Sequence, residues 1–456
     1  MKRDAKMSDD LIAKYGDARV PRYTSYPTAA AFSAAVGPDE YAGNLAHIAA
    51  AGPVSVYLHV PFCRSICWYC GCHTTITRQD APVADYLDVM KEEIELVSFA
   101  AGNDVPVKYV HFGGGTPSVM KPQEFSALMA KLRSAFTFEA KAGVAVEIDP
   151  RTLVAPMIDA LAENGVDRAS LGVQSYDPIV QAGIKRLQSF EQTERAVAGL
   201  RSAGVSSINF DLIYGLPKQT VQSCIETVRL AAELRPERFA VFGYAHIPAF
   251  KKHQRLIDEA SLPDAKQRNE QAEVIAEELQ KAGYLRIGLD HFALPNDQLA
   301  LAARNRTLRR NFQGYTTDDC DSLIGLGASA IGRLPAGYMQ NHVPLGLYAE
   351  RIAFGVLPTA KGYLLSEEDK LRARVIERLM CDFEADLGQL SSGSGFDTGF
   401  LVERNDRLGE LMADGVVTIS GERIVVCEEA RFMVRAVAAA FDAYFSSHGH
   451  THSKAA

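Results

Sequence analysis

The sequence contains no apolar run that approaches the roughly 20 residues needed to cross a bilayer, so no membrane-spanning helix is expected. Its first 17 residues are charged and lack the apolar stretch of a secretory signal peptide. Basic residues are not in excess either, because the formal net charge is −8. An acidic chain is poorly suited to nucleic acids, since phosphate contacts need a basic face. We therefore expect a cytoplasmic protein that binds neither membranes nor nucleic acid.

A disulfide framework is also not expected. Four of the eight cysteines crowd into ten residues, CRSICWYCGC (63–72), and the others are scattered. Crowding of this kind in a cytoplasmic chain indicates metal binding. The length of 456 residues, with 47% hydrophobic and 23% charged residues, is typical of one large globular domain with smaller attachments.

From residue 54 onward, short β-branched or aromatic runs alternate with longer amphipathic stretches. The runs cover residues 54–60, 107–113, 143–149, 168–173, 206–215 and 239–245. Helical spacing recurs between them, for example over 81–102, 121–136 and 218–234. Repeated β-then-α units imply a parallel sheet with helices outside. Six units predict an α/β fold, a (β/α)6 partial TIM barrel, with its chemistry at the C-terminal ends of the strands.

The flanking segments differ from this repeat. The string VPRYTSYPTA (20–29), with two prolines, favours an extended arm. Near the other end, a Ser–x–x–Asp capping box opens a helix over 365–387, a hairpin follows over 416–426, and a last helix is expected over 430–445. The predicted parts are an N-terminal arm (1–53), a catalytic barrel (54–355), a mostly helical C-terminal domain (356–446) and a disordered tail (447–456).

The cysteine cluster directly follows the first predicted strand. Cys63, Cys67 and Cys70 form a C-x3-C-x2-C pattern, and thiolates are the natural ligands of iron–sulfur clusters. A structural zinc site would instead need two well-separated C-x2-C pairs. One short loop can wrap three corners of a cubane and leave the fourth iron open to a small chelating ligand. Cys72 is a further candidate ligand at this point, and a zinc site is the alternative.

Glycines or polar residues follow the other predicted strands. The string HFGGGTPS (111–118) comes after the second strand, and its glycines allow backbone groups to approach a ligand closely. Glu147, Gln174 and Asp211 end the third, fourth and fifth strands, and Arg186 lies in the helical stretch after the fourth. Carboxylates can hydrogen-bond ribose hydroxyls or balance a cationic ligand, and an amide can contact polar edges in a buried pocket.

A CxxxCxxC loop after the first strand of a βα barrel resembles the radical S-adenosylmethionine (SAM) superfamily. The resemblance implies a [4Fe–4S] cluster on Cys63, Cys67 and Cys70, with SAM chelating the open iron, and it implies that Cys72 is not a ligand. In that superfamily an aromatic residue precedes the third cysteine, as Tyr69 does here. The glycine loop is similar to the motif that holds the SAM amino group.

Longer strings resemble the oxygen-independent coproporphyrinogen III oxidases, from about residue 20 to the C-terminal domain. They include VPRYTSYPTA, YLHVPFC, GGGTPS, EIDPR, LGVQS, DLIYGLPKQT, YAHIPAF, NFQGYTT and GLGASAIG. The resemblance implies oxidative decarboxylation of the ring A and B propionates of coproporphyrinogen III to vinyl groups, which gives protoporphyrinogen IX in haem biosynthesis. A SAM-derived 5′-deoxyadenosyl radical would abstract a β-hydrogen from each propionate.

The same resemblance implies two SAM molecules that lie side by side. The first would contact Tyr57, Tyr69, Gly114, Glu147 and Ile331, of which Tyr57 and Glu147 are the expected catalytic residues. The second would contact Gly115, Thr116, Gln174, Arg186, Asp211 and Ala245, with Phe312 and Gln313 as neighbours. The arm, with Arg22, is expected to close over the substrate. The basic residues expected to orient the substrate carboxylates are Arg22, Arg151, Arg186 or Lys218.

Expected partners are coproporphyrinogen III, a reduced electron donor of the flavodoxin or ferredoxin type and an unidentified electron acceptor, and the chain is expected to act as a monomer. Two other interpretations use the same scaffold. One is a haem-binding chaperone without decarboxylase activity, although such relatives generally lack the RYTSYPTA arm and the C-x-C extension of Cys70 and Cys72. The other is a radical SAM enzyme that acts on another tetrapyrrole, for example by methyl transfer.

Overall fold

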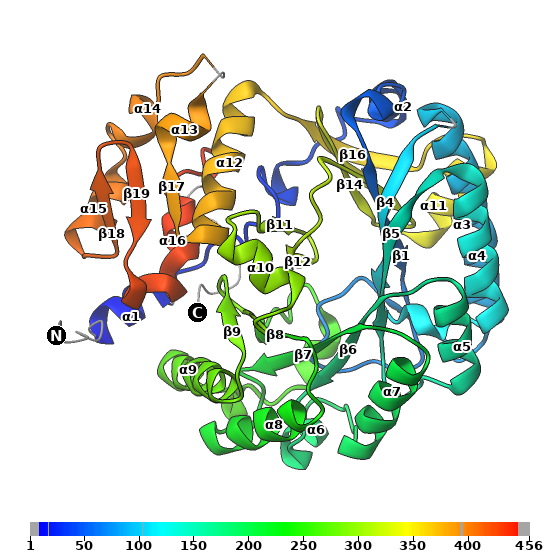
Figure 1. Cartoon of the computed structure of the whole chain (residues 1–456), viewed down its shortest axis with the longest axis horizontal. Helices are drawn as coiled ribbons and strands as arrows, with labels where there is room; N and C mark the ends of the chain where they lie inside the picture. The colour runs from blue at the N-terminus through cyan, green and yellow to red at the C-terminus, as the bar shows by residue number, and fades with distance from the viewer. Residues whose placement is uncertain (1–8, 17, 103, 393–394, 446–456) are drawn as a thin grey trace.

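The computed structural model describes residues 9–16, 18–102, 104–392 and 395–445 and is built around one twelve-stranded sheet (Figure 1). Six strands at its centre are parallel neighbours in chain order. They are β1 (Val54–Val60), β4 (Pro106–Gly114), β5 (Thr137–Ile148), β6 (Arg168–Gln174), β7 (Ser207–Tyr214) and β8 (Arg238–Gly243). Each coincides with a predicted run, so the prediction of an α/β fold with six parallel units is confirmed.

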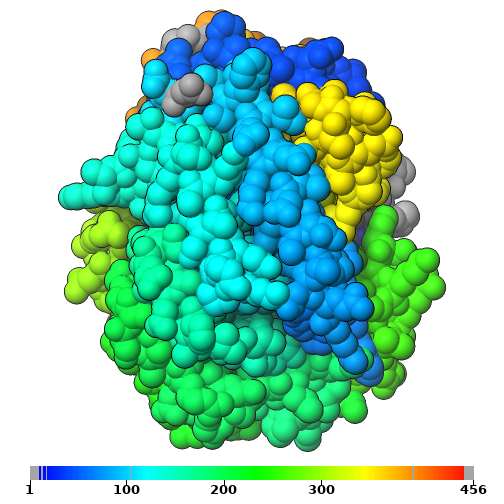
Figure 2. Space-filling view, turned by 90° about the vertical axis from the view of Figure 1, so that its right-hand side faces the viewer, coloured from blue at the N-terminus to red at the C-terminus, as the bar shows by residue number. Residues whose placement is uncertain are grey.

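Helices follow these strands and cover the outer face of the sheet. They are α3 (Ala81–Ala101), α4 (Pro122–Ala135), α5 (Ala155–Glu163), α6 (Pro178–Gly183), α7 (Phe190–Ser202), α8 (Val221–Glu233) and α9 (Ala265–Lys281). In α3, Val83, Leu87, Met90, Ile94 and Val97 are buried at helical spacing and form one apolar stripe. Figure 2 looks onto this side of the molecule, where the chain from α3 onward, coloured blue through green, forms much of the surface.

The sheet continues beyond the parallel core on both sides. β13 (Ser322–Leu326) runs parallel to β1 and is followed by the antiparallel strands β14 (Ile331–Leu334), β15 (Gly337–Asn341) and β16 (Thr359–Leu364). The antiparallel strands β10 (His291–Ala293) and β9 (Leu285–Ile287) form the other edge. Among the described residues the edge strands β16 and β9 do not pair with each other, so the barrel is partial. The smaller elements are β2 (Phe62–Cys63), β3 (Thr75–Ile76), α10 (Gln298–Arg304), β11 (Arg309–Asn311), β12 (Gly314–Thr316) and α11 (Leu345–Ala353).

The strand β16 lies beyond residue 355, where the sequence predicts the end of the barrel. Its sequence, TAKGYL, has no clear alternation of apolar and polar residues. Gly362 packs its backbone against Tyr338 and bridges to Ser33 of the arm, so a glycine stands where an apolar side chain is expected. The large sheet therefore extends further along the chain than the predicted boundary, and the division into domains stays a prediction.

The C-terminal residues form a separate core beside the barrel (Figure 1). Its elements are α12 (Glu367–Asp382), β17 (Glu384–Asp386), α13 (Leu387–Ser391), α14 (Gly399–Val402), α15 (Asp406–Ala413), β18 (Val417–Ser420), β19 (Arg423–Val426) and α16 (Val434–Ala439). The predicted capping box is present where Ser366 and Asp369 exchange hydrogen bonds, and the predicted hairpin is β18–β19. The expected helix over 430–445 is wrong in length, because a 3-10 turn precedes α16 and the chain after it turns to bury Phe441 in this core.

The N-terminal arm packs against the C-terminal core. Val20, Tyr23 and Tyr26 are buried in it, and the Tyr23 hydroxyl donates to Asp442 at 3.0 Å. The stretch 20–28 has no helix, as predicted, but the arm also contains α1 (Asp9–Gly16) and α2 (Pro38–Leu45). The predicted tail, 447–456, lies outside the described residues. No described helix has the length and apolar character of a membrane span.

A buried carboxyl group fixes the edge of the barrel next to β1. Glu93 on α3 accepts hydrogen bonds from the backbone N–H of Gly327 at 2.6 Å, Nδ2 of Asn341 at 2.6 Å and the hydroxyl of Tyr348 at 2.7 Å. These donors belong to the loop after β13, to β15 and to α11, so one side chain links α3 to all of them. Burial raises the pKa of Glu93 to about 7.

We expect Glu93 to make the stability of this fold depend on pH. Its folded pKa of about 7 exceeds the ordinary 4.5, so its contribution is complete below pH 4.5 and is lost as the pH rises through 7. The free energy of unfolding should fall by about 3 kcal/mol on this account. Urea unfolding at about pH 4.5 and about pH 8 checks this, because Glu93→Gln should lack that part of the loss. Equal losses in both proteins would contradict the assignment.

Candidate active site

A cavity of about 620 Å³ lies at the C-terminal ends of the parallel strands. Twelve of the predicted site residues line it: Cys63, Cys67, Tyr69, Cys70, Gly114, Gly115, Thr116, Glu147, Gln174, Arg186, Asp211 and Ala245. Tyr57 and Ile331 are not part of this lining. Because parallel strands bring their C-terminal ends to one edge, the fold gathers residues that are far apart in the sequence into one chamber, which we call the cysteine cavity.

The loop after β1 presents Cys63, Cys67, Cys70 and Cys72 to the cysteine cavity. The sulfur of Cys63 lies 3.3 Å from the hydroxyl groups of Thr74 and Thr116. A hydrogen bond from Cys72 lowers the pKa of the Cys70 thiol to about 6. All of these cysteines are free of disulfides. Free thiols that share one cavity and face hydrogen-bond donors fit the ligand set of an iron–sulfur cluster.

The segment after β8 holds this loop from the other side. Three of its side chains donate hydrogen bonds to backbone carbonyls of the loop: Lys251 to Cys72 at 2.9 Å, His253 to Cys70 at 2.7 Å and Gln254 to Tyr69 at 3.0 Å. Since these contacts use only carbonyl groups, they fix the shape of the loop and leave its thiols available to a ligand.

The glycine loop at the end of β4 lies directly against the cysteine loop. A Cβ atom at Gly115 would lie 2.6 Å from the carbonyl oxygen of Phe62, and one at Gly114 would lie 2.8 Å from the ring of His59. Gly114 also has a φ of +114°, which side chains rarely adopt. Its backbone N–H donates to Oε2 of Glu147 at 3.1 Å. Both positions therefore need glycine, for packing and for backbone conformation.

Two histidines that the sequence reasoning missed lie beside Tyr57 and Glu147. The Tyr57 hydroxyl is 3.0 Å from Nδ1 of His59, whose Nε2 is 3.1 Å from the carbonyl oxygen of His73. Nε2 of His111 is 3.3 Å from Oε1 of Glu147. The sequence signal that could have identified them is a histidine between apolar residues of a strand, in LHV (58–60) and in VHF (110–112). Tyr57 therefore lies outside the cavity lining, but it packs against Gly113 of the glycine loop and contacts the loop through His59 as well.

Arg186 is buried beside one of the thiols. Its Nη2 donates to the carbonyl oxygen of Gly172 at 2.7 Å, and its Nη1 lies 3.6 Å from the sulfur of Cys67. Arg151 also reaches this sulfur, at 3.7 Å, and both arginines pair with Asp149, at 2.6 Å for Arg151 and 3.4 Å for Arg186. The sequence reasoning missed Asp149, although it belongs to the EIDPR string. This carboxylate holds two cations next to the thiol.

Two further polar side chains line the floor of the cavity. Burial raises the pKa of Asp211 to about 7, and the charge of Glu147 adds to this effect. Ser170 and Asn209 donate to the Asp211 carboxylate at 3.2 and 2.8 Å. Gln174 has a φ of +68°, and its Oε1 is buried with no hydrogen-bond partner among the described residues. A buried acceptor of this kind has the capacity to bind a ligand.

A second cavity, of about 560 Å³, adjoins the first, and we call it the arginine cavity. The wall common to both consists of Arg22, Cys72, Phe242, Gly243, Tyr244, Ala245 and Ile247. Phe312 and Gln313 line the arginine cavity, as neighbours of the second predicted ligand site. Arg151 lines the cysteine cavity only, and Lys218 lines neither. Arg22 brings the N-terminal arm to the junction of the two cavities.

Comparison with known proteins places this geometry in a family. The sequence profile of the Radical SAM superfamily matches residues 57–231, which include the cysteine and glycine loops. The chain is 54% identical over 449 residues to the oxygen-independent coproporphyrinogen III oxidase of Bradyrhizobium diazoefficiens, with 98% of this chain and 100% of the relative covered. The chain belongs to the oxygen-independent coproporphyrinogen III oxidase family.

Other members of the family agree with this placement. A Pseudomonas aeruginosa protein of the same name is 39% identical over 442 residues, with 96% of each chain covered. The coproporphyrinogen III oxidase HemN from Escherichia coli, described as a radical SAM enzyme, matches with a TM-score of 0.90 at 35% identity, over 96% of this chain and 100% of that chain. The predicted radical SAM fold, family and cofactors are confirmed: as a radical SAM enzyme the chain uses a [4Fe–4S] cluster and SAM.

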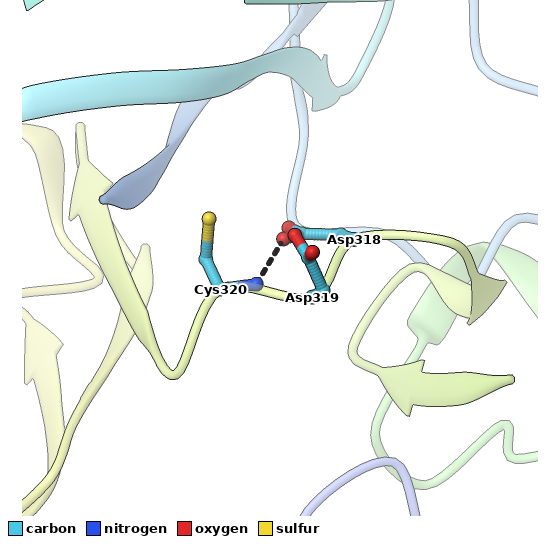
Figure 3. A group of neighbouring side chains, drawn as sticks. All are labelled: Asp318, Asp319 and Cys320. Atoms are coloured by element: carbon cyan, nitrogen blue, oxygen red, sulfur yellow. Dashed lines mark hydrogen bonds between the residues drawn. The ribbon is translucent and has the colours of Figure 1, made fainter. Parts of the chain in front are cut away.

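One group of potential metal ligands lies away from both cavities (Figure 3). Asp318, Asp319 and Cys320 precede β13, at the end of the sheet opposite the cysteine loop. Asp318 accepts from the Cys320 backbone at 2.9 Å and from the Ser55 hydroxyl, and Asp319 accepts from Lys108 at 2.8 Å. Since both carboxylates already have partners within the protein, this group has a structural role.

Proposed function

We propose that this chain oxidatively decarboxylates the ring A and B propionates of coproporphyrinogen III to vinyl groups, and so makes protoporphyrinogen IX for haem biosynthesis. The observation that carries the proposal is the 54% identity to a coproporphyrinogen III oxidase over 98% of the chain. That likeness includes the arm, whose Arg22 lies at the junction of the cavities. When bound, the cluster and SAM supply the 5′-deoxyadenosyl radical that accepts a propionate β-hydrogen.

We assign both SAM molecules to the cysteine cavity. The first would contact Tyr69, Gly114 and Glu147, with Tyr57 and Ile331 outside the lining, and the second would contact Gly115, Thr116, Gln174, Arg186, Asp211 and Ala245. Two observations support a pair of cationic ligands. The cavity has a carboxylate for each sulfonium, Glu147 and Asp211, and the unpartnered Oε1 of Gln174 can accept a hydrogen bond.

Glu147 and Tyr57 receive different roles in this proposal. Glu147 lines the cavity and accepts from the backbone of Gly114, so it is placed to touch the first SAM as a catalytic residue. The hydroxyl of Tyr57 is engaged by His59, which packs under Gly114. Tyr57 is therefore a positioning residue for the glycine loop, through its hydroxyl group on His59 and its ring against Gly113.

Removal of this hydroxyl in Tyr57→Phe should raise the KM for SAM by about threefold to tenfold, because one neutral hydrogen bond is lost. The kcat should change little, since the reacting groups stay in place. Formation of 5′-deoxyadenosine at limiting and saturating SAM measures both constants. Tyr109→Phe, on the same β4 strand as the glycine loop but outside the cysteine cavity, is the control. A Tyr57→Phe enzyme that matches the wild type at limiting SAM would remove this role.

We further propose that a reduced flavodoxin or ferredoxin delivers the electron to the cluster, that an unidentified acceptor takes up the substrate electron, and that the chain works as a cytoplasmic monomer. Lys252 and Arg255 are exposed on the segment that holds the cysteine loop, and their charge suits an acidic donor.

The proposed function is tested with anaerobically purified protein, reconstituted with iron and sulfide. It is mixed with reductant, SAM, coproporphyrinogen III and a cell extract as the source of the electron acceptor, and chromatography follows 5′-deoxyadenosine and the oxidised porphyrins. Products with three and then two carboxyl groups are expected. Formation of 5′-deoxyadenosine with an unchanged porphyrin would contradict the proposal. A methylated tetrapyrrole would favour a methyl-transferring radical SAM enzyme, and haem binding without turnover would favour a haem chaperone.

A further inference from the structure

The arginine cavity has a surplus of positive charge. Six arginines line it against two carboxylates, Glu273 and Asp290. Both carboxylates already have partners, because Arg286 lies 3.8 Å from Glu273 and His291 lies 2.7 Å from Asp290. A cavity with this composition attracts an anion, since unbalanced charge in a space with limited access to water is costly.

The arginines come from all three parts of the chain. Arg22 belongs to the arm, Arg310 to β11 of the barrel and Arg435 to α16 of the C-terminal core. Arg310 donates to the carbonyl oxygen of Arg22 at 3.3 Å, and Arg435 donates to that of Pro21 at 3.0 Å. The arm is therefore held over the cavity by the same side chains that supply the charge.

The guanidinium of Arg310 has bonding capacity that the protein does not use. Its side chain is 5% exposed, and neither Nε nor Nη1 has a hydrogen-bond partner among the described residues. The nearest carboxylate oxygen, on Asp290, is 4.0 Å away, and the Tyr315 ring lies 4.5 Å below. Buried guanidinium groups normally bond through most of their N–H groups. Arg310 thus presents two unused donors in the lining of the cavity.

Arg22 lies at the junction of the two cavities and, unlike Arg310, is exposed. It forms no ion pair with any described residue, although it lines both cavities. Desolvation by the surrounding protein lowers the pKa values of Arg22 and Arg435. The charge of Arg310 lowers both further, and the charge of Arg22 also lowers the pKa of Arg435. Burial alone would raise the pKa of Asp290, but His291, Arg310 and Arg22 lower it to about 2. The arginine cavity is therefore a cationic site, because the carboxylate of Asp290 does not neutralise the arginines around it.

We propose that the arginine cavity binds the substrate through the propionates that the reaction leaves intact, with Arg310 and Arg435 as their ligands and Arg22 as the ligand of the propionate that reaches the cysteine cavity. Arg310 and Arg435 line the arginine cavity and not the cysteine cavity, whereas Arg22 lies in the wall that the two share. Arg310 also lines a third cavity, of about 800 Å³. This assignment rests on the proposed function for the identity of the tetrapyrrole.

The shape and chemistry of the cavity suit such a ligand. Phe242, Phe312 and Phe432 also line it, so apolar walls are available for the macrocycle between the charged positions. A guanidinium forms two parallel hydrogen bonds to a carboxylate, which orients as well as attracts it. A tetracarboxylate would thus be held at its far side while one propionate at a time enters the cysteine cavity. A product with two fewer carboxylates would be bound less tightly and released.

The test is the affinity of the full-length reconstituted protein for porphyrins with different numbers of carboxylates. Isothermal titration with coproporphyrin III, which has four, and mesoporphyrin IX, which has two, gives a selectivity ratio for each variant. Arg310→Gln and Arg22→Gln should each weaken binding of coproporphyrin III by about tenfold or more, because a hydrogen bond to a charged group is lost. Both substitutions should also bring the ratio of the affinity for coproporphyrin III to that for mesoporphyrin IX closer to one. Arg310→Lys should restore part of the affinity, but not the geometry.

Arg229→Gln is the matched control, since Arg229 is an exposed arginine on α8 paired with Glu226. Because Arg310 also supports the arm, Arg22→Gln, which removes no hydrogen bond between described residues, provides the second test. Iron content and the thermal midpoint verify that each variant is folded. Folded variants that bind coproporphyrin III within twofold of the wild type would overturn the proposal. If the variants lose coproporphyrin III binding but the wild type itself never decarboxylates coproporphyrinogen III, the cavity assignment is upheld and the proposed function is rejected.

Discussion

The Cys67→Ala variant should form no detectable 5′-deoxyadenosine under conditions in which the wild type forms it continuously. Cys67 is buried between Cys63 and Cys70 in the loop, and its sulfur receives hydrogen bonds from Arg151 and Arg186. Loss of one of three thiolates leaves two corners of the cluster without a protein ligand, so the cluster should be lost or unable to bind SAM productively. Iron and sulfide analysis, with chromatography of the nucleoside, measures both effects.

The matched control is Cys72→Ala in the same loop. Cys72 lies in the wall shared by the two cavities and donates a hydrogen bond to Cys70. The resemblance to the radical SAM superfamily implies that it is not a ligand of the cluster. We expect this variant to keep the iron and sulfide content of the wild type. If Cys72→Ala lost the cluster as completely as Cys67→Ala, the assignment of three ligands would be incorrect.

Gly115→Ala should lower the rate of SAM cleavage by about a hundredfold, which is the size of effect that a misplacement of about 1 Å at a reacting centre produces. The new Cβ would lie 2.6 Å from the carbonyl oxygen and 2.8 Å from the backbone nitrogen of Phe62, immediately before Cys63. Backbone atoms cannot move aside as a flexible side chain would. The glycine loop and the cysteine loop must therefore separate, and both contribute to the cysteine cavity.

Gly71→Ala tests whether any added methyl group in this region has the same effect. Gly71 lies between Cys70 and Cys72 and lines the cysteine cavity, but a Cβ atom there would meet no protein atom within 4 Å. We expect near-normal activity and cluster content. The initial rate of deoxyadenosine formation, measured for both variants at saturating SAM, gives the comparison. Similar rates in the two variants would show that close packing at Gly115 is not the reason for the glycine.

The parallel core could be predicted because its local and global signals agree. The run VSVYLHV alternates, with Val54, Val56, Leu58 and Val60 on the face that packs in the core with α3, and it became β1 with the predicted bounds. The Ser366 capping box likewise identified the start of α12. Where local pattern and packing disagree, the prediction failed. The last helix stops at α16 because Phe441 is drawn into the C-terminal core, a tertiary contact that helical spacing does not reveal.

The cysteine cavity was predictable for a similar reason, since motifs at the ends of parallel strands must meet. Residues that act through other residues could not be predicted from the sequence. Asp149 orients Arg151 and Arg186, and His59 stands between Tyr57 and the glycine loop, but neither role follows from spacing. Of the residues that line the arginine cavity, the sequence analysis named Arg22, Ala245, Phe312 and Gln313, but not Arg310 or Arg435. Arg310 and Arg435 reach it from β11 and α16, which lie far apart in the sequence, and both donate to carbonyl groups of the arm.

The central claim, that this chain removes a hydrogen from the substrate propionate with a SAM-derived radical, is tested most directly by isotope transfer. Coproporphyrinogen III carrying deuterium at the β-carbons of its propionates is incubated with the reconstituted protein, reductant, SAM and the electron acceptor. Mass spectrometry then measures deuterium in 5′-deoxyadenosine and the carboxyl count of the porphyrin. The account predicts deuterated 5′-deoxyadenosine that accumulates together with vinyl products. Unlabelled 5′-deoxyadenosine beside vinyl products would contradict the assigned hydrogen abstraction.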